Sequence, residues 1–233
     1  MRNIVKYHFS VNVMSLLSLA FCLLLFGCEH ESYESGTGKY SGLHADFADV
    51  RTKQSETLIS AVLDNGREVV FQQPLSYVWA EAPATTYRAL LYYYETSTVD
   101  MVNPFMAQQV HVLPWKKASI GLANLLKDPI HVESYWISEN GKYINLRIGL
   151  MIGKDDSDDS KLHRIGINHD STTIRENGCH SYALSFLHSQ NGVPEYYTTH
   201  QFISLPLNEC SPGDEIVLTI NTYDGMKQYT FDI

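Results

Sequence analysis

Residues 128–150 read DPIHVESYWISENGKYINLRIGL, and this stretch decides the fold. In its second half, apolar residues take alternate positions: Ile144, Leu146, Ile148 and Leu150. Because successive side chains of a strand point to opposite faces, this spacing predicts a half-buried strand. Asn140-Gly141 separates it from a second apolar run, Val132 to Ile137, and Asn-Gly accepts the positive φ of a tight hairpin turn. The stretch therefore predicts an antiparallel hairpin that turns one face toward a core.

The same two signals recur outward along the chain. Further turn dipeptides are Asn65-Gly66, Asn177-Gly178, Asn191-Gly192 and Asp224-Gly225. The predicted strands between them are 57–63, 68–71, 88–94, 109–113, 132–137, 143–150, 182–187, 196–205, 215–223 and 228–233. Repeated turns between short apolar runs are typical of antiparallel sheet, so the fold class is all-β.

One segment indicates where the folded part divides. Residues 118–127 (ASIGLANLLK) predict a short helix, which ends ahead of Asp128-Pro129 because proline disfavours helix in the residue before it. We expect residues 40–127 to form a small OB-like β-barrel of about five strands. Residues 128–233 should form an antiparallel β-sandwich.

The beginning of the chain has the pattern of an export signal. Arg2 and Lys6 precede an apolar run from Val13 to Phe26, and the run ends in Leu25-Phe26-Gly27-Cys28. A small residue before a cysteine, with leucine at the third position back, resembles the bacterial lipobox, in which the cysteine becomes the lipid-carrying N-terminus. We therefore expect residues 1–27 to be a lipoprotein signal peptide and Cys28 to be the lipidation site. The competing interpretation is an ordinary signal or an uncleaved anchor with a chance cysteine.

Residues 28–39 (CEHESYESGTGK) follow as a flexible acidic tether without apolar periodicity. Beyond it, only Cys179 and Cys210 remain, and an exported protein lies where disulfides can form. A bridge between these two cysteines and a pair of free thiols are both open from the sequence.

Charge argues against a nucleic-acid partner. Residues 28–233 hold 15 Lys and Arg against 26 Asp and Glu, a net charge of −11. A phosphate backbone would be repelled, and no interleaving of basic and aromatic residues is seen in 40–113.

Motifs for catalysis and metal binding are missing from the sequence. No G-x-S-x-G or H-E-x-x-H pattern occurs, and the ten histidines lack zinc spacing, although His188 and His200 could meet across the Asn191-Gly192 hairpin. The Asp-rich stretch 154–161 lacks the glycine and distal glutamate of a calcium loop. We predict no catalytic residue, no metal and no cofactor.

Aromatic residues crowd the first predicted domain. The candidate binding patch consists of Tyr77, Trp79, Tyr92, Tyr93 and Tyr94. Aromatic side chains on a surface often contact a protein or a glycan, whereas the same residues would otherwise pack the core and rim of the barrel.

Together, the lipobox, the β-rich segment 40–127 and the stretches 128–150, 199–207 (THQFISLPL) and 214–233 (DEIVLTINTYDGMKQYTFDI) resemble the NigD-like lipoproteins of Bacteroidetes. The resemblance implies an OB-like barrel followed by a β-sandwich, with no reaction attached to the family. Glu29, Glu31 and Glu34, which follow Cys28, resemble the surface-export signals of Bacteroidetes lipoproteins, and this resemblance implies an outer-membrane lipoprotein that faces the exterior.

We therefore expect a non-catalytic, lipid-anchored cell-envelope protein that binds an unknown protein or glycan partner. Two other functions stay open. One is an envelope hydrolase acting on glycan or peptide, which would need a cleft with acids or a nucleophile. The other is a structural subunit of a surface assembly, which would need an open apolar edge strand.

Overall fold

A computed structural model describes residues 38, 40–117, 127–154 and 161–233. Residues 43–233 make one compact unit. The predicted signal peptide, Cys28, the tether apart from Gly38, the predicted helix up to residue 126 and residues 155–160 of the Asp-rich stretch lie outside the described residues. No helix long and apolar enough to cross a membrane occurs in the described part of the chain.

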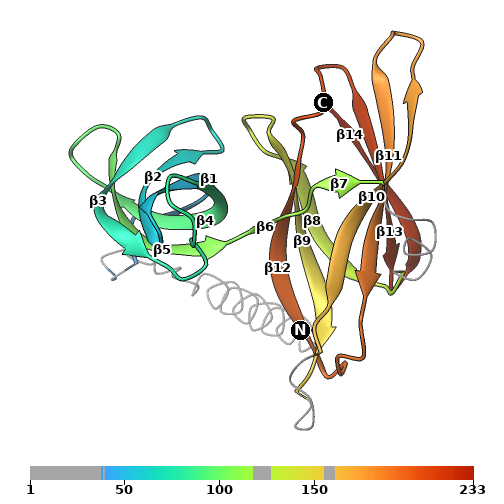
Figure 1. Cartoon of the computed structure of the whole chain (residues 1–233), viewed down its shortest axis with the longest axis horizontal. Coiled ribbons are helices and arrows are strands. Elements are labelled where there is room, and N and C mark those ends of the chain that lie inside the picture. Colours follow the sequence, from blue (N-terminus) through green and yellow to red (C-terminus); the bar gives the residue numbers. More distant parts are fainter. Residues whose placement is uncertain (1–37, 39, 118–126, 155–160) are drawn as a thin grey trace, which may run out of the picture. The chain divides into compact units, whose positions relative to one another are not determined.

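The first five strands close into a barrel in the order β1-β2-β3-β5-β4, coloured blue to green in Figure 1. They are β1 (Leu43–Gln54), β2 (Thr57–Leu63), β3 (Glu68–Ser76), β4 (Thr86–Glu95) and β5 (Met101–Gln109). Its interior is filled by alternate residues of these strands, among them Val50, Leu63, Leu91 and Val102, each 1% exposed or less. The predicted small barrel is confirmed.

The remaining strands form two sheets packed face to face. One contains β14 (Gly225–Asp232), β13 (Glu215–Thr222), β11 (His180–Ser189), β10 (Arg164–Ile174) and β7 (Trp115–Lys116), in that order. The other contains β6 (His111–Val112), β12 (Tyr197–Pro206), β9 (Tyr143–Ile152) and β8 (His131–Ile137). One core joins Ile144 and Leu146 of the second sheet to Leu184 and Leu218 of the first, so the predicted sandwich is confirmed.

Pairing within the sandwich is mostly antiparallel, with three parallel exceptions. β11 runs parallel to β13, and the two-residue strands β7 and β6 run parallel to β10 and β12. Four of the five predicted turn dipeptides connect antiparallel neighbours. The fifth, Asn191-Gly192, has positive φ at both residues, 50° and 75°, but joins β11 of the five-stranded sheet to β12 of the four-stranded sheet, so the hairpin predicted there is wrong.

The boundary between barrel and sandwich lies earlier than the sequence indicates. β6 and β7 pair with sandwich strands, so residues 111–116, which the prediction assigned to the barrel domain, belong to the sandwich sheets. A two-residue strand is too short to show a periodic pattern in the sequence. The sheet that β7 and β6 join depends on their pairing with β10 and β12, which lie about 50 and 90 positions further along the chain.

Candidate functional site

The centre of the contact between barrel and sandwich is Arg88, on the outer face of β4. Its side chain has no exposed surface. Nη1 and Nη2 donate hydrogen bonds of 2.6 Å to Oδ1 and Oδ2 of Asp64, and Asp49 Oδ1 lies 3.5 Å from Nη1. Because a buried guanidinium is costly without a charged partner, these two carboxylates allow Arg88 to be buried.

Arg88 also reaches the sandwich. Nε donates to Ser204 Oγ at 3.4 Å and Nη2 donates to Asn145 Oδ1 at 3.3 Å. Ser204 and Asn145 are cross-strand neighbours of β12 and β9, and the Ser204 hydroxyl donates to Asn145 Oδ1 at 2.7 Å. The guanidinium lies 4.2 Å from the centre of the Tyr143 ring, a cation–π distance. These contacts join the barrel to the outer face of the four-stranded sheet.

Aromatic contacts extend this interface. The Phe47 ring of β1 meets Phe202 edge-on at 5.1 Å and Trp136 at 5.4 Å. Burial, and then the neighbouring Asp49 carboxylate, raise the pKa of Tyr143 to about 12. The Arg88–Asp64 ion pair is therefore flanked by aromatic side chains, which limit the access of water to its hydrogen bonds.

Beside this interface the outer surface of the barrel is hollowed into a trough of about 430 Å³. Two cross-strand rows cross it. One row runs Arg88–Asp49–Val62–Glu68 and the other runs Thr86–Arg51–Ser60–Val70. Lys142, from the β8–β9 turn of the sandwich, closes one side, and Asp100 lies on the other. The small residues of β2 make the floor, because larger side chains stand only on the strands that flank it.

The two walls of the trough differ in charge. On the β1 side are Arg51 and Lys142, and Lys142 Nζ lies 3.6 Å from Asp49 Oδ2. On the β3 side are Glu68 and Asp100. Arg51 and Glu68 are exposed, and neither has an ion pair or a side-chain hydrogen bond among the described residues. The trough therefore presents unpaired charges of both signs across a floor of small residues.

The five aromatic residues predicted as a patch do not form one surface. Tyr77 and Trp79 are partly buried against the barrel core and stack on each other at 5.2 Å. Tyr93 is buried inside the barrel, where its hydroxyl donates to Asp46 Oδ2 at 2.8 Å. Only Tyr92 and Tyr94 lie half-buried on the outer face. Because successive residues of β4 point to opposite faces, Tyr93 lies on the other face of the strand from Tyr92 and Tyr94. Most residues of the predicted patch therefore pack within the barrel.

Cys179 and Cys210 are free thiols in this structure, so the bridge that the sequence left open is not formed here. Both lie near the turn at residues 211–214. A Cβ placed on Gly213 would stand 2.8 Å from Cys179 Sγ, while burial and then Asp214 raise the pKa of the Cys210 thiol to about 11.

His188 contacts His163 and not, as the sequence suggested, His200. His163 Nδ1 and His188 Nε2 are 2.9 Å apart, and His188 Nδ1 lies 3.1 Å from the Asp128 carbonyl oxygen. A carbonyl only accepts, so His188 Nδ1 carries the proton and His163 Nδ1 donates to His188 Nε2. Burial lowers the pKa of both rings, and the His188 charge lowers the pKa of His163 further.

His200 contacts a carboxylate on the outer face of the four-stranded sheet. Its Nε2 contacts Glu133 Oε1, and Arg147 Nε lies 2.9 Å from Glu133 Oε2. In the described part of the chain, no group of three His, Cys, Asp or Glu side chains is arranged to hold a metal ion.

One serine contacts a carboxylate. Ser185 Oγ donates to Asp170 Oδ2 at 2.6 Å, beside a cavity of about 160 Å³ on the outer face of the five-stranded sheet. The lining of this cavity includes no histidine. His169, next to Asp170, bonds to Thr172 and packs against Trp115 instead. The serine therefore has a carboxylate beside it and no histidine in the lining of the cavity.

Sequence reasoning missed Arg88, Asp64, Asn145 and Ser204. Arg88 was visible as the one charge within the apolar strand RALLYYY, and a charge in such a strand needs a partner. Nothing local identifies that partner, because Asn145 and Ser204 are 57 and 116 positions away.

Several solved structures share this fold. A NigD-like immunity protein from Bacteroides caccae ATCC 43185 is 21% identical, with a TM-score of 0.60 over 81% of this chain and 91% of that chain. A protein of unknown function from Bacteroides vulgatus ATCC 8482 is 17% identical, with a TM-score of 0.61 over 82% and 90%. A candidate lipoprotein from Bacteroides fragilis NCTC 9343 is 11% identical, with a TM-score of 0.51 over 81% and 96%.

None of the curated proteins compared with this chain matches it. The family model described as the NigD-like C-terminal beta sandwich domain matches residues 112–233. That range begins at the strand β6 that joins the sandwich, and it covers more than half of the chain. The protein therefore belongs to the NigD-like family.

Proposed function

We propose that this protein is a non-catalytic, lipid-anchored module of the cell envelope that binds a partner through the trough. The observation that carries the proposal is the pair of unpaired, oppositely charged residues Arg51 and Glu68 across that trough. Exposed charges in a concave surface are arranged more often for recognition than for stability, because surface ion pairs add little to folding. Arg88 supports this arrangement by fixing Lys142 of the sandwich beside the barrel.

The position of the trough agrees with a binding role. OB-like barrels commonly bind ligands on the face of their second and third strands, and β2 and β3 supply six of the eleven lining residues here. This is an analogy at the level of the fold. A nucleic acid fits poorly, since the lining holds Asp49, Glu68 and Asp100 against two basic residues.

The chemistry of the lining favours binding over catalysis. Its hydroxyl groups belong to Ser60 and Thr86, and no histidine or cysteine lines the trough. A hydroxyl without a neighbouring base is a weak nucleophile. The three carboxylates keep the hydrolase as the competing function, which a glycan or peptide cleavage assay with the purified protein would reveal.

Anchoring rests on the sequence at Leu25 to Cys28 and on the family. Cys28 would carry the lipid, and the acidic residues that follow favour the outer membrane and its exterior. A structural relative named as a candidate lipoprotein is consistent with this. Another is named as a NigD-like immunity protein.

The proposal is tested by photo-cross-linking in intact cells. A photoreactive phenylalanine analogue replaces Val70, which lines the trough and is 54% exposed, or Val78, which is 75% exposed outside it. We expect Val70 to yield one reproducible adduct, identified by mass spectrometry, and Val78 to yield none. Identical adducts from both positions, or no adduct from Val70, would contradict the proposal.

A further inference from the structure

We propose that the trough binds an extended peptide segment of a partner protein that carries one acidic and one basic side chain about 10 Å apart. This inference rests on the proposed binding function and names the chemistry of its partner.

The β1 wall is suited to an anion. Arg51 stands exposed beside Thr86, its cross-strand neighbour on β4, and Lys142 reaches the same side from the sandwich with 53% of its side chain exposed. Lys142 is partly neutralised by Asp49, but Arg51 has no charged partner among the described residues. A guanidinium offers a planar fork that matches a carboxylate. The acidic side chain of the peptide therefore belongs at Arg51.

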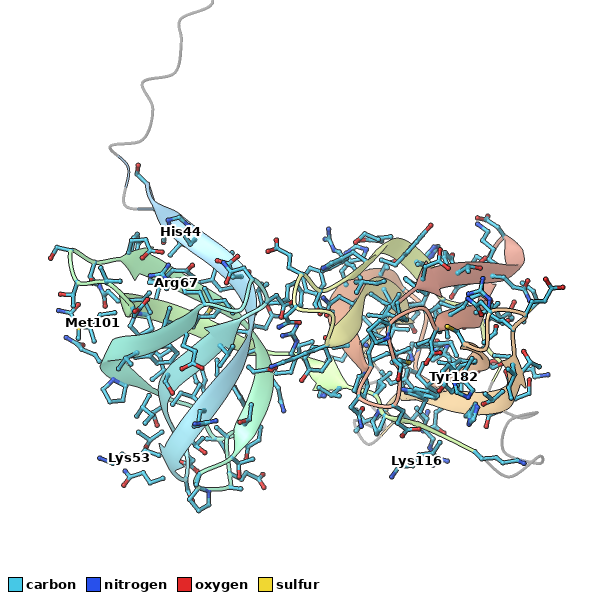
Figure 2. The ribbon with its side chains drawn as sticks, turned by 90° about the horizontal axis from the view of Figure 1, so that it is seen from above. His44, Lys53, Arg67, Met101, Lys116 and Tyr182 are labelled. Carbon is cyan, nitrogen blue, oxygen red and sulfur yellow. The ribbon has the colours of Figure 1, made fainter. Side chains whose placement is uncertain are left out.

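The β3 wall is suited to a cation. Glu68 is exposed and unpaired in the described part of the chain. Asp100 comes directly before Met101, the partner of Val70, and the Val70 N–H donates a hydrogen bond of 2.8 Å to the Asp100 carbonyl oxygen. Arg67 lies 4.0 Å from Asp100 but is held by Glu95, to which it donates two hydrogen bonds. Figure 2 shows Arg67 and Met101 on the same side of the barrel. The basic side chain of the peptide therefore belongs at Glu68 and Asp100.

The distance between the walls sets the spacing in the peptide. β1 and β3 are both neighbours of β2, so the walls are two strand spacings, or about 10 Å, apart. A chain in the extended polyproline II conformation advances about 9 Å in three residues and brings residues i and i+3 to the same face. An acidic residue and a basic residue at positions i and i+3 therefore match the two walls. The volume of about 430 Å³ is in the range of pockets that hold small ligands, so it suits a short segment.

The floor favours a peptide over a glycan. Ser60, Val62 and Val70 are small or β-branched, and no aromatic residue lines the trough. Flat aromatic surfaces, which a sugar ring would use for stacking, are therefore missing. Small apolar side chains between the two charges of a peptide would instead rest against Val62 and Val70, since burying apolar surface stabilises the contact.

The test uses the full lipidated chain in a mild detergent at low salt. The probes are fluorescein-labelled hexapeptides with the central sequence Glu-Ala-Val-Lys, the same peptide with the acid, the base or both replaced by glutamine, and a swapped peptide with lysine in place of the acid. Fluorescence anisotropy measures each affinity. Because exposed ion pairs contribute modestly, each charge should change the affinity about two- to fivefold.

Arg51→Glu should weaken the Glu-Ala-Val-Lys probe and strengthen the swapped probe. Lys53→Glu is the matched control, because Lys53 is exposed on the same strand but does not line the trough. Figure 2 shows Lys53 at the opposite end of the barrel from His44. Both Arg51→Glu effects, absent from the Lys53→Glu variant, would support the inference.

Two results would overturn it: equal binding of the charged and neutral probes, or an equal effect of Arg51→Glu and Lys53→Glu. Failure of this inference can be told apart from failure of the proposed function. If the Val70 position captures one partner in cells but the probes show no charge preference, the binding function stands and the peptide chemistry is wrong. A carbohydrate adduct at Val70 would likewise contradict the peptide and leave the binding function intact.

Discussion

Arg88 of the barrel binds Asp64 through two parallel hydrogen bonds of 2.6 Å, and this pair lies against the sandwich. Asp64 follows directly on the end of β2 and precedes the Asn65-Gly66 turn, so a local turn positions the acceptor for a side chain of β4. The same guanidinium bonds to Ser204 and Asn145. The Arg88 side chain of β4 therefore connects the β2–β3 turn, through Asp64, to the outer face of the sandwich, through Ser204 and Asn145.

Replacing Arg88 with alanine should lower the free energy of unfolding by about 3–5 kcal/mol, because Asp64 and Asn145 lose the partner for which they are buried. Chemical denaturation measures the change. Arg67→Ala is the control, since its pair with Glu95 is partly exposed and should cost less than about 1 kcal/mol. Equal losses in the two variants would show that Arg88 does not hold the interface.

The double variant Arg88→Met with Asp64→Leu should recover much of that stability. Replacing both members of a buried pair by apolar residues of similar size removes the unpaired charge as well as the bond. A double variant that is as unstable as Arg88→Ala would show that the bonds to the sandwich, and not charge burial, dominate.

The stability of the protein should fall below about pH 6.5 because of His163 and His188. Burial lowers the pKa of both rings in the folded state, so the unfolded chain binds more protons in the range between the lowered and the ordinary pKa. The contribution of the two neutral rings to the free energy of unfolding is therefore complete above pH 6.5, and it is lost as the pH falls through the lowered pKa values. Each ring contributes a slope of at most about 1.4 kcal/mol per pH unit.

His188→Gln should reduce that slope, as measured by denaturation from pH 5 to 8. Charged groups near the pair are Asp128 and Glu195, which raise the pKa of His188 and so limit the effect. His111→Gln, at an exposed position of β6, should leave the slope as it is in the original protein. The same slope in His188→Gln as in the original protein would assign the pH dependence to other groups.

Cys28→Ser should release the protein from membranes. Without a thiol at the lipobox position no lipid can be attached, and the tether alone has no apolar segment to hold it. Cell fractionation and mass spectrometry of the N-terminus check this. Cys22→Ser, within the apolar run, should keep the protein at the membrane, and retention of Cys28→Ser would refute the lipidation site.

The two thiols can be counted by alkylation of the unfolded protein without reductant. Two alkyl groups would match the free thiols of the structure, and none without reductant would show the disulfide. In the folded protein, Cys210 should react slowly at pH 7.5 and faster toward pH 11, because burial raises its pKa and only the thiolate reacts. Fast labelling of Cys210 at pH 7.5 would contradict its burial.

Local signals determined much of the fold. The alternation in 143–150 and the Asn-Gly turns are set by side-chain direction and by φ within a few residues. The structure confirms the alternation and the turns, although Asn191-Gly192 connects the two sheets and does not form a hairpin. β1, β7, β10 and all of β5 except Gln109 escaped prediction. In β5 the pairing register with β4 shifts, since Met106 pairs with Tyr92 and Pro104 with Tyr93. The shift interrupts the alternation of side chains next to Pro104, a residue type that is rare inside strands.

The family is a property of the sequence, since its model matches residues 112–233, and the proposed anchor site at Cys28 rests on four consecutive residues. The trough and the Arg88 contacts were decided only by tertiary structure. Arg51, Ser60 and Val70 are neighbours because of the register in which β1, β2 and β3 pair, Thr86 joins them because β4 closes the barrel against β1, and Arg88 meets Ser204 because barrel and sandwich pack together. Charge and burial at these positions depend on partners that are distant in sequence, and no local pattern encodes which strands will lie side by side.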